Sequence, residues 1–283
     1  MTVASPTSPA ETPVTIRIDG TPVTVAAGDT LLDACRSAGV DTPTICYGDT
    51  LTPVNTCRAC VVEVDGNRTL APACSRPAEE GMVVHTDSER VRHSRRMVLE
   101  FLAGSVDLSQ ADGLARWVTE YGADPSRYGA DAARVDDDPK VQDGLFVRAY
   151  EQCVLCYKCV EACGDDAQRT YAIAVAGRGF ESRISTEFDV ELPESACVYC
   201  GNCIEVCPTN ALQFTTEFER RAEGSWHPEE QTVTTTVCSY CGVGCNLELH
   251  VQDNEIVKVT SPHDHDVTSG NLCIKGRFGW RYV

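Results

Sequence analysis

The runs CVLCYKCVEACG at 153–164 and CVYCGNCIEVCP at 197–208 decide the organisation of this chain. Each run has the spacing C-x2-C-x2-C-x3-C, in which a tight loop turns three thiolates toward one 4Fe-4S cluster and a short helix carries the fourth toward a second cluster. Zinc also binds CxxC pairs, but a structural zinc site takes four ligands, usually from two separated pairs. Two three-plus-one sets of cysteines fit zinc poorly, so the tandem predicts a two-cluster 4Fe-4S domain over residues 151–225.

Composition narrows the class of protein further. The 283 residues include 17 cysteines, and an odd count argues against a complete disulfide framework. The N-terminal stretch MTVASPTSPAETP has neither a basic region nor an apolar one, so residues 1–13 are expected to form a disordered tail and not an export signal. No apolar run approaches the ~18 residues that a membrane span needs, and we expect a cytoplasmic protein whose thiols stay reduced. The net charge of −18 excludes nucleic acid as an expected partner.

Residues 14–87 predict a β-grasp domain that carries a 2Fe-2S cluster. Residues 14–25 alternate as a hairpin, and a helix that begins after Thr30 and ends at Gly39 follows them. Further strands are expected at 60–64 and 82–84. Four cysteines with the spacing C-x10-C-x2-C-x13-C suit a 2Fe-2S cluster in a surface loop, whereas a zinc ribbon would need a second CxxC pair. These four are Cys46, Cys57, Cys60 and Cys74.

The region 88–150 contains no cysteine. Residues 88–103 are expected to form a helix with one apolar side, and the sequence after it turns small and polar. We therefore predict a helix followed by a polar connector.

Residues 230–283 predict a small β-rich domain with a further 4Fe-4S cluster. A strand at 232–237 leads into CSYCGVGC, and a hairpin is expected to follow across Asp253-Asn254. The candidate ligands, spaced C-x2-C-x3-C-x27-C, are Cys238, Cys241, Cys245 and Cys273. Lys275 is either a cation that faces cluster or cofactor charge or an ordinary surface lysine. Sixteen of the 17 cysteines are thus used, and Cys35, on the first helix, is read as a small core hydrophobe.

The order of these motifs, ending in CSYCGVGC and LCIKGR, resembles the N-terminal part of the catalytic alpha subunit of cytoplasmic, NAD-linked molybdopterin formate dehydrogenases. More distantly it is similar to the large iron–sulfur subunit of respiratory complex I and of bidirectional hydrogenases. The resemblance covers nearly the whole chain from residue 14. It implies an α+β fold, with a β-grasp 2Fe-2S domain, a two-cluster bacterial ferredoxin-like domain and a small 4Fe-4S domain in that order.

The resemblance also implies a distribution of ligands. It assigns the first four cysteines to one 2Fe-2S cluster and places Lys275 between the last cluster and the pterin. The three implied 4Fe-4S sets are Cys153, Cys156, Cys159 with Cys207; Cys197, Cys200, Cys203 with Cys163; and Cys238, Cys241, Cys245 with Cys273.

Three departures from the family pattern have consequences. Many relatives place a cluster with one histidine and three cysteine ligands after the helix at 88–103, but AGSVDLSQADG here holds no such ligands, so we expect that cluster to be absent. Gly164 replaces the usual proline after the first run, which predicts intact ligation in a looser loop. The sequence also ends ten residues after Cys273, before the family's pterin domains, so molybdopterin with Mo or W is expected on a partner chain or on a missing C-terminal part.

The sequence therefore predicts an electron-transfer module of a formate dehydrogenase-type oxidoreductase. It would relay electrons between a pterin-bearing chain or domain and a flavin/NAD diaphorase-type subunit or a ferredoxin. Catalytic residues are not expected in this chain. Two alternatives stay open: an electron-input subunit of a hydrogenase or of a complex I-like, NADH-linked complex, and a zinc-binding structural protein.

Overall fold

The computed structural model describes residues 12–282, which fall into two compact units. The first unit contains residues 12–45, 57–99 and 121–123, and the second contains residues 46–56, 100–120 and 124–282. The first eleven positions of the tail expected at 1–13 lie outside the described residues.

The first unit is built on a five-stranded mixed sheet. Strands β1 (Val14–Ile18) and β2 (Thr21–Val25) form the predicted hairpin, and β1 also pairs in parallel with β5 (Val83–His85). Strand β5 pairs with β3 (Val61–Val64), which in turn pairs with the two-residue strand β4 (Ala71–Pro72). The spatial order is therefore β2-β1-β5-β3-β4. The strands predicted at 60–64 and 82–84 are confirmed to within a residue or so.

Helix α1 (Leu31–Ser37) packs its apolar side into this unit. Thr30 begins the helix with a capping box, in which its hydroxyl accepts from the backbone of Asp33 and the Asp33 carboxylate accepts from the backbone of Thr30. Leu31, Leu32 and Cys35 are almost fully buried. The backbone of Leu32 also donates to the carbonyl of Ala73, next to Cys74, at 3.0 Å.

The helix predicted at 88–103 is α2 (Glu89–Ser105), and the chain passes along it from the first unit to the second. The region expected to be a plain polar connector holds more structure than that. It contains helix α3 (Asp112–Glu120) and strand β6 (Phe146–Arg148). Leu114 and Trp117 on α3 are buried, and so are all three residues of β6.

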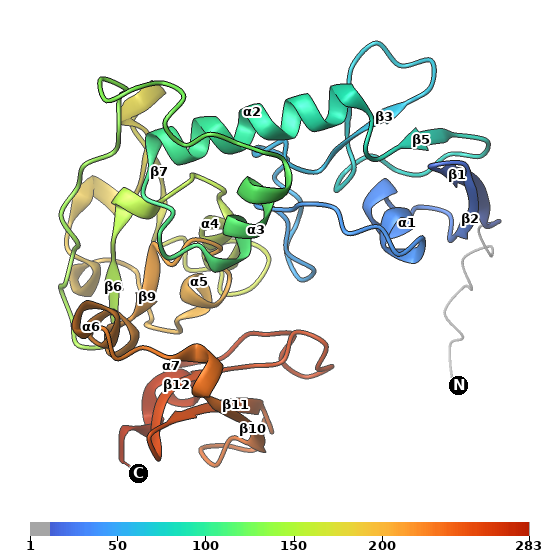
Figure 1. The fold of residues 1–283 in the computed structure, drawn as a ribbon. Coiled ribbons are helices and arrows are strands. Elements are labelled where there is room, and N and C mark those ends of the chain that lie inside the picture. Colours follow the sequence, from blue (N-terminus) through green and yellow to red (C-terminus); the bar gives the residue numbers. More distant parts are fainter. Residues whose placement is uncertain (1–11, 283) are drawn as a thin grey trace, which may run out of the picture. The chain divides into compact units, whose positions relative to one another are not determined.

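In the second unit, the strand before the first central cysteine run pairs with the strand after the second run. Strand β6 lies antiparallel to β9 (Leu212–Phe214), as Figure 1 shows. In the sequence, helices α4 (Lys158–Cys163) and α5 (Asn202–Glu205) lie between these two strands. A small hairpin of β7 (Ala174–Ala176) and β8 (Arg183–Ser185) lies between the runs in sequence.

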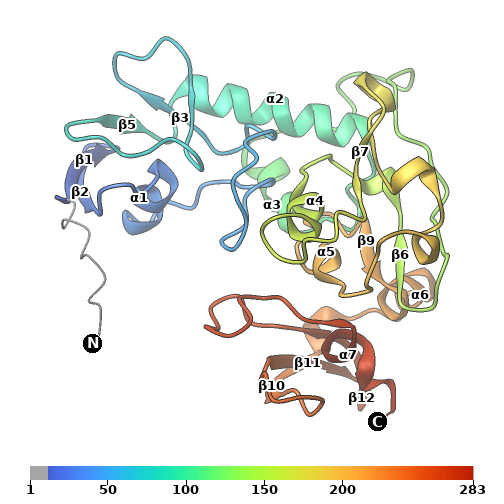
Figure 2. The same cartoon turned by 180° about the vertical axis from the view of Figure 1, so that it is seen from behind.

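The end of the chain forms a three-stranded antiparallel sheet with a short helix beside it (Figure 2). The strands of this sheet are β10 (Thr232–Val237), β11 (Asn246–Gln252) and β12 (Glu255–Thr260). Helix α6 (Thr215–Glu223) precedes the sheet, and α7 (Ile274–Phe278) packs on β12. Both the predicted strand at 232–237 and the hairpin across Asp253-Asn254 are confirmed. Six short 3-10 helices complete the described elements: Tyr150–Gln152, Gly179–Glu181, Glu187–Asp189, Leu192–Glu194, Pro228–Glu230 and Gly279–Tyr282.

Candidate iron–sulfur sites

The two central cysteine runs adopt the same backbone pattern. In each run, the residues two and four positions after the first cysteine have positive φ: Leu155 and Tyr157 in the first, Tyr199 and Gly201 in the second. Alternation of this kind turns successive backbone N–H groups toward one side, where they can meet a negative charge. The backbone of Tyr199 accordingly approaches the sulfur of Cys197 at 3.4 Å. Three of the four positions hold non-glycine residues, so the loops carry strain that a bound anionic group would compensate.

Two cavities lie against these loops, and each is lined by four cysteines drawn from both runs. One cavity is lined by Cys153, Cys156, Cys159 and Cys207. The other is lined by Cys163, Cys197, Cys200 and Cys203. The exchange of the fourth cysteine between the runs is the arrangement that the family resemblance implied. Apolar side chains close both cavities, and Leu212 of β9 belongs to the lining of each.

These thiols lie in a low-dielectric setting. Burial raises the pKa of Cys153 to about 11 and that of Cys156 to about 12, although a backbone N–H group acts in the opposite direction in each case. Burial and the neighbouring thiols also raise the pKa of Cys159 and of Cys203 well above its ordinary value. A thiolate is the form that binds metal, so a metal centre here must displace the protons and supply positive charge. The donor set, soft sulfur in a dry cavity with inward N–H groups, fits an iron–sulfur cluster.

Several hydrogen bonds hold the loop after the first run, where Gly164 replaces the usual proline. The backbone groups of Thr170 and Tyr171 donate to the carbonyl of Cys163 at 3.0 and 3.1 Å, and Arg169 donates to the carbonyl of Gly164 at 2.8 Å. The Thr170 hydroxyl lies 3.4 Å from the sulfur of Cys163. A Cβ at Gly164 would lie 3.1 Å from the carbonyl oxygen of Val160, so glycine suits this close turn.

The C-terminal cysteines form a more open group. Cys238 is buried and Cys245 is half-buried, whereas Cys241 and Cys273 are exposed. Burial raises the pKa of Cys245, and the other three thiols raise it further, which indicates that the four gather at one place. The backbone of Cys238 donates to the carbonyl of Cys245 at 2.8 Å and closes the loop. Lys275 is also exposed, two residues beyond Cys273.

Three of the four N-terminal candidate ligands lie in the first unit. Cys60 and Cys74 are buried and Cys57 is half-buried, and the backbone of Ala59 approaches the sulfur of Cys57 at 3.5 Å. Cys46 begins the segment 46–56, which is grouped with the second unit, so its membership of this quartet stays a prediction.

Cys35 is the one cysteine that the sequence did not assign to a cluster. It is fully buried on α1, where burial raises its pKa to about 11. All 17 cysteines lie among the described residues, and no disulfide joins any of them.

Sequence reasoning missed the polar group that joins the second cysteine run to α7. Arg277 is completely buried and contacts Asn202 and Glu205. An arginine four residues after a candidate ligand, inside the LCIKGR motif, was the available signal.

Three family models match the chain, and together they define its class. A 2Fe-2S iron-sulfur cluster binding domain matches residues 11–89, a 4Fe-4S dicluster domain matches residues 152–211, and a molybdopterin oxidoreductase Fe4S4 domain matches residues 231–283. The chain therefore carries three iron–sulfur domains of mixed α/β, ferredoxin-like character, the last of which is the Fe4S4 domain found in molybdopterin oxidoreductases. The predicted presence of 2Fe-2S and 4Fe-4S domains is confirmed.

Individual relatives come from several kinds of redox enzyme. A subunit of an NADH-quinone oxidoreductase of Rhizobium meliloti is 32% identical over 95% of this chain and 31% of its own length. A Staphylococcus haemolyticus protein with the provisional name formate dehydrogenase is 28% identical over the same shares. Among solved structures, an NAD+-reducing [NiFe]-hydrogenase in the H2-reduced state is similar with a TM-score of 0.62 and 25% identity, over 71% of this chain and 87% of that one. The module is homologous to all three.

The chain spans about a third of the length of the curated relatives it matches. Within the described residues, every helix is too short or too polar to span a lipid bilayer.

Proposed function

We propose that the chain relays electrons between a metal–pterin site that interconverts formate and carbon dioxide and a second carrier, either a flavin/NAD diaphorase-type subunit or a ferredoxin. Iron–sulfur clusters supply one-electron transfer when they are bound. The residues of this chain hold them, exclude water and set their potentials through burial and hydrogen bonds. Molybdopterin, with Mo or W, would be carried by a partner chain or by a further part of a longer chain.

The openness of the C-terminal quartet is the observation that carries this proposal. Cys241 and Cys273 are exposed, although a cluster on them would need a dry surrounding. A rim of exposed apolar side chains adjoins them in sequence: Val237, Tyr240, Val243 and Ile274 are between 41% and 61% exposed. Exposed apolar groups that gather at one place mark a surface for another protein or domain. Lys275 lies on the same segment, where it could face an anionic cofactor.

The proposed ligands follow the cavities and the loops. One 2Fe-2S cluster would be held by Cys46, Cys57, Cys60 and Cys74, in a β-grasp domain over residues 14–87. Three 4Fe-4S clusters would be held by the two sets that line the cavities of the ferredoxin-like domain and by the C-terminal quartet. Lys275 would lie between the last of these and the pterin.

A second candidate is an electron-input module of a hydrogenase or of a complex I-like, NADH-linked complex. The similarity to an NAD+-reducing hydrogenase and the 32% identity to a component of an NADH-quinone oxidoreductase support it. The identity to the relative with a formate dehydrogenase name is lower, at 28%. The Fe4S4 domain match at 231–283 supports a pterin-bearing neighbour but says nothing about the substrate.

Metal content tests the shared core of both candidates. Protein purified without oxygen should contain about 14 iron atoms and as much sulfide per chain, from one 2Fe-2S and three 4Fe-4S sites. A colourless preparation loaded with zinc would contradict both candidates and favour the structural zinc protein.

Co-purification separates the two redox candidates. The native complex should contain a pterin and reduce a viologen dye when formate is added. A complex that lacks pterin, and reduces the dye with hydrogen or NADH but not with formate, would refute the formate assignment and support the second candidate.

A further inference from the structure

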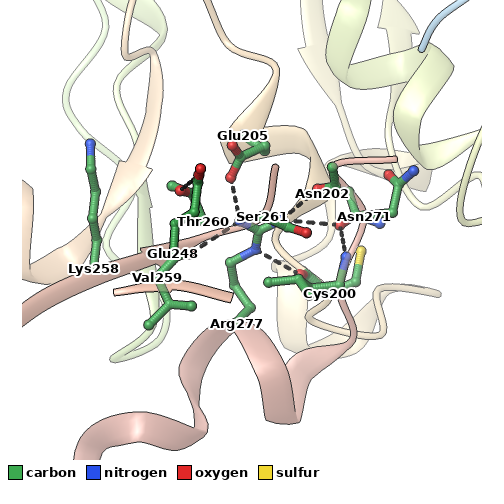
Figure 3. A network of polar contacts seen from close by, with 12 residues as sticks. Cys200, Asn202, Glu205, Glu248, Lys258, Val259, Thr260, Ser261, Asn271 and Arg277 are labelled. Atoms are coloured by element: carbon green, nitrogen blue, oxygen red, sulfur yellow. Dashed lines mark hydrogen bonds and ion pairs between the residues drawn. The ribbon is translucent and has the colours of Figure 1, made fainter. Parts of the chain in front are cut away.

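Arg277 of α7 lies buried within a shell of acceptors. Its exposed fraction is 0%, and Figure 3 shows its guanidinium surrounded by oxygen atoms from several directions. It donates to the Val259 carbonyl at 3.1 Å, to the Gly270 carbonyl at 3.3 Å and to the carboxylate of Glu205. The planar guanidinium offers five N–H groups in a fixed fork, so this shell uses nearly its full capacity.

The acceptors come from two different cysteine regions. Val259 and Gly270 belong to the C-terminal domain, whereas the other partners belong to the second cysteine run. Arg277 Nε approaches the carbonyl of Cys200 at 3.5 Å, and Nη2 lies 3.3 Å from the side-chain oxygen of Asn202. The same Asn202 oxygen accepts from the backbone of Leu272 at 3.0 Å, one residue before Cys273. One side chain and its neighbours thus join two loops that carry candidate ligands.

The second cysteine loop is shaped to admit this arginine. Gly201, between Cys200 and Asn202, has φ +70°, and a Cβ there would lie 2.8 Å from Cγ of Arg277 and 3.1 Å from Cζ of Phe278. Most side chains at position 201 would force the loop and α7 apart. The close approach of α7 to the Cys200 loop therefore depends on glycine at position 201.

Stability alone does not explain a buried ion pair at this place. Removing two charges from water costs about as much as their attraction returns, and apolar residues of similar volume often stabilise as well. A buried cation beside a cluster has a second effect, because net charge and hydrogen bonding near a cluster set its reduction potential. The buried Arg277 guanidinium lies against the Cys200 carbonyl, so its positive charge would favour an added electron on a cluster held by the Cys200 loop.

We propose that Arg277 is a positioning residue that fixes the Cys200 loop against the segment carrying Cys273 and raises the reduction potential of the cluster held by the Cys200 loop. The arginine itself gains and loses neither an electron nor a proton. The inference deepens the proposed function and depends on the presence of clusters.

The test is a redox titration, followed by EPR, of the full chain with its clusters reconstituted. In Arg277→Met, which removes the charge, the midpoint potential of one 4Fe-4S signal should fall by at least ~59 mV, a tenfold change in a one-electron equilibrium constant. In Arg277→Lys, which keeps a charge but loses the fork, the potential should fall less. Arg281→Met is the matched control, because Arg281 lies four residues further on and is exposed, and it should leave every potential unchanged.

A second variant keeps the proposal falsifiable if Arg277→Met fails to fold. Glu205→Gln removes the negative partner and leaves Arg277 unopposed, so the same potential should rise. A merely structural role predicts no such change of sign. Full iron content with unmoved potentials in a folded Arg277→Met, or an unmoved or lowered potential in Glu205→Gln, would overturn the inference and leave the proposed function intact. Absence of iron from the unmodified chain would instead refute the proposed function.

Discussion

The two central cysteine runs and the C-terminal quartet differ in how they are covered. The central runs lie in an apolar core of which Phe146, Ile184 and Phe214 are members, and every one of their eight cysteines is at least partly buried. The C-terminal quartet has a small core around Leu247 and Val259 and leaves two of its cysteines exposed. The central domain therefore shields its own cysteines from water, whereas the C-terminal domain leaves two of its four candidate ligands in contact with solvent.

The largest expected effect comes from removing a ligand of the insulated pair. Cys200→Ala should lose one 4Fe-4S signal in EPR and about 4 of about 14 iron atoms, because one cavity loses a sulfur donor. Ser195→Ala, a change near the same run that removes no sulfur, should keep the full iron content. Equal iron in the two variants would contradict the assignment of Cys200 as a ligand.

The next prediction tests the difference in solvent exposure between the C-terminal and the central cysteines. When the isolated chain is exposed to ferricyanide or to an iron chelator, the C-terminal cluster should be lost at least about 10-fold faster than either central cluster, since two of its four cysteines are exposed to solvent. The decay of each EPR signal against time provides the measurement. In the native complex this difference should shrink, and loss of all clusters at one rate in the isolated chain would remove the distinction between the two regions.

A smaller effect is expected for Cys35, which is buried but is not a predicted ligand. Cys35→Ala should keep the iron content unchanged and lower the free energy of unfolding by about 1 kcal/mol, from the loss of a small buried group. The thiol pKa of about 11 also predicts slow alkylation of Cys35 in the folded protein at about pH 8, measured by peptide mass spectrometry. A loss of iron would show that Cys35 belongs to a cluster site.

The smallest expected effect concerns an ion pair between the C-terminal domain and the second central cysteine run. His263 Nε2 lies 3.7 Å from the Glu205 carboxylate, which raises the pKa of the histidine, although burial of the ring acts in the opposite direction. A raised folded-state pKa means that this contribution to stability is complete below the ordinary pKa of about 6.5 and is lost as the pH rises through the folded value. The histidine is 47% exposed, so the contribution should stay under about 1 kcal/mol.

The measurement is the difference in unfolding free energy between the unmodified chain and His263→Gln. It should be larger at about pH 6 than at about pH 8.5. A difference that is the same at both values would show that the ion pair makes no contribution.

The sequence predicted local structure well where the pattern was periodic. The hairpins at 14–25 and 246–260 were readable because side chains alternate and Asp-Gly or Asp-Asn marks each turn. Helix α3 was missed although Leu114 and Trp117 are spaced three residues apart, because the surrounding glycines and acidic residues suggested a loop. Strand β6 was missed for a different reason: its partner β9 lies more than 60 residues away, and no local pattern reports such a pairing.

Most of the candidate ligands could be predicted from cysteine spacing, because three ligands on one short loop must be close together in the sequence. The exchange of the fourth cysteine between the runs was predicted only from the family resemblance and stays a prediction; each cavity is lined by three cysteines of one run and one of the other. The hydrogen bonds of Arg277 were not predictable, because the carbonyls of Cys200, Val259 and Gly270 lie far apart in the sequence and come together only in the folded chain.

The pairing of β6 with β9 has a consequence for how such modules spread among enzymes. The two strands bring the first and last turns of the segment 146–214 next to each other, with both central cysteine runs enclosed between them. A segment whose ends are neighbours can be inserted into, or cut from, a longer chain without stretching the host. The same two strands would thus serve as the natural boundaries for transplanting this pair of sites into an unrelated protein.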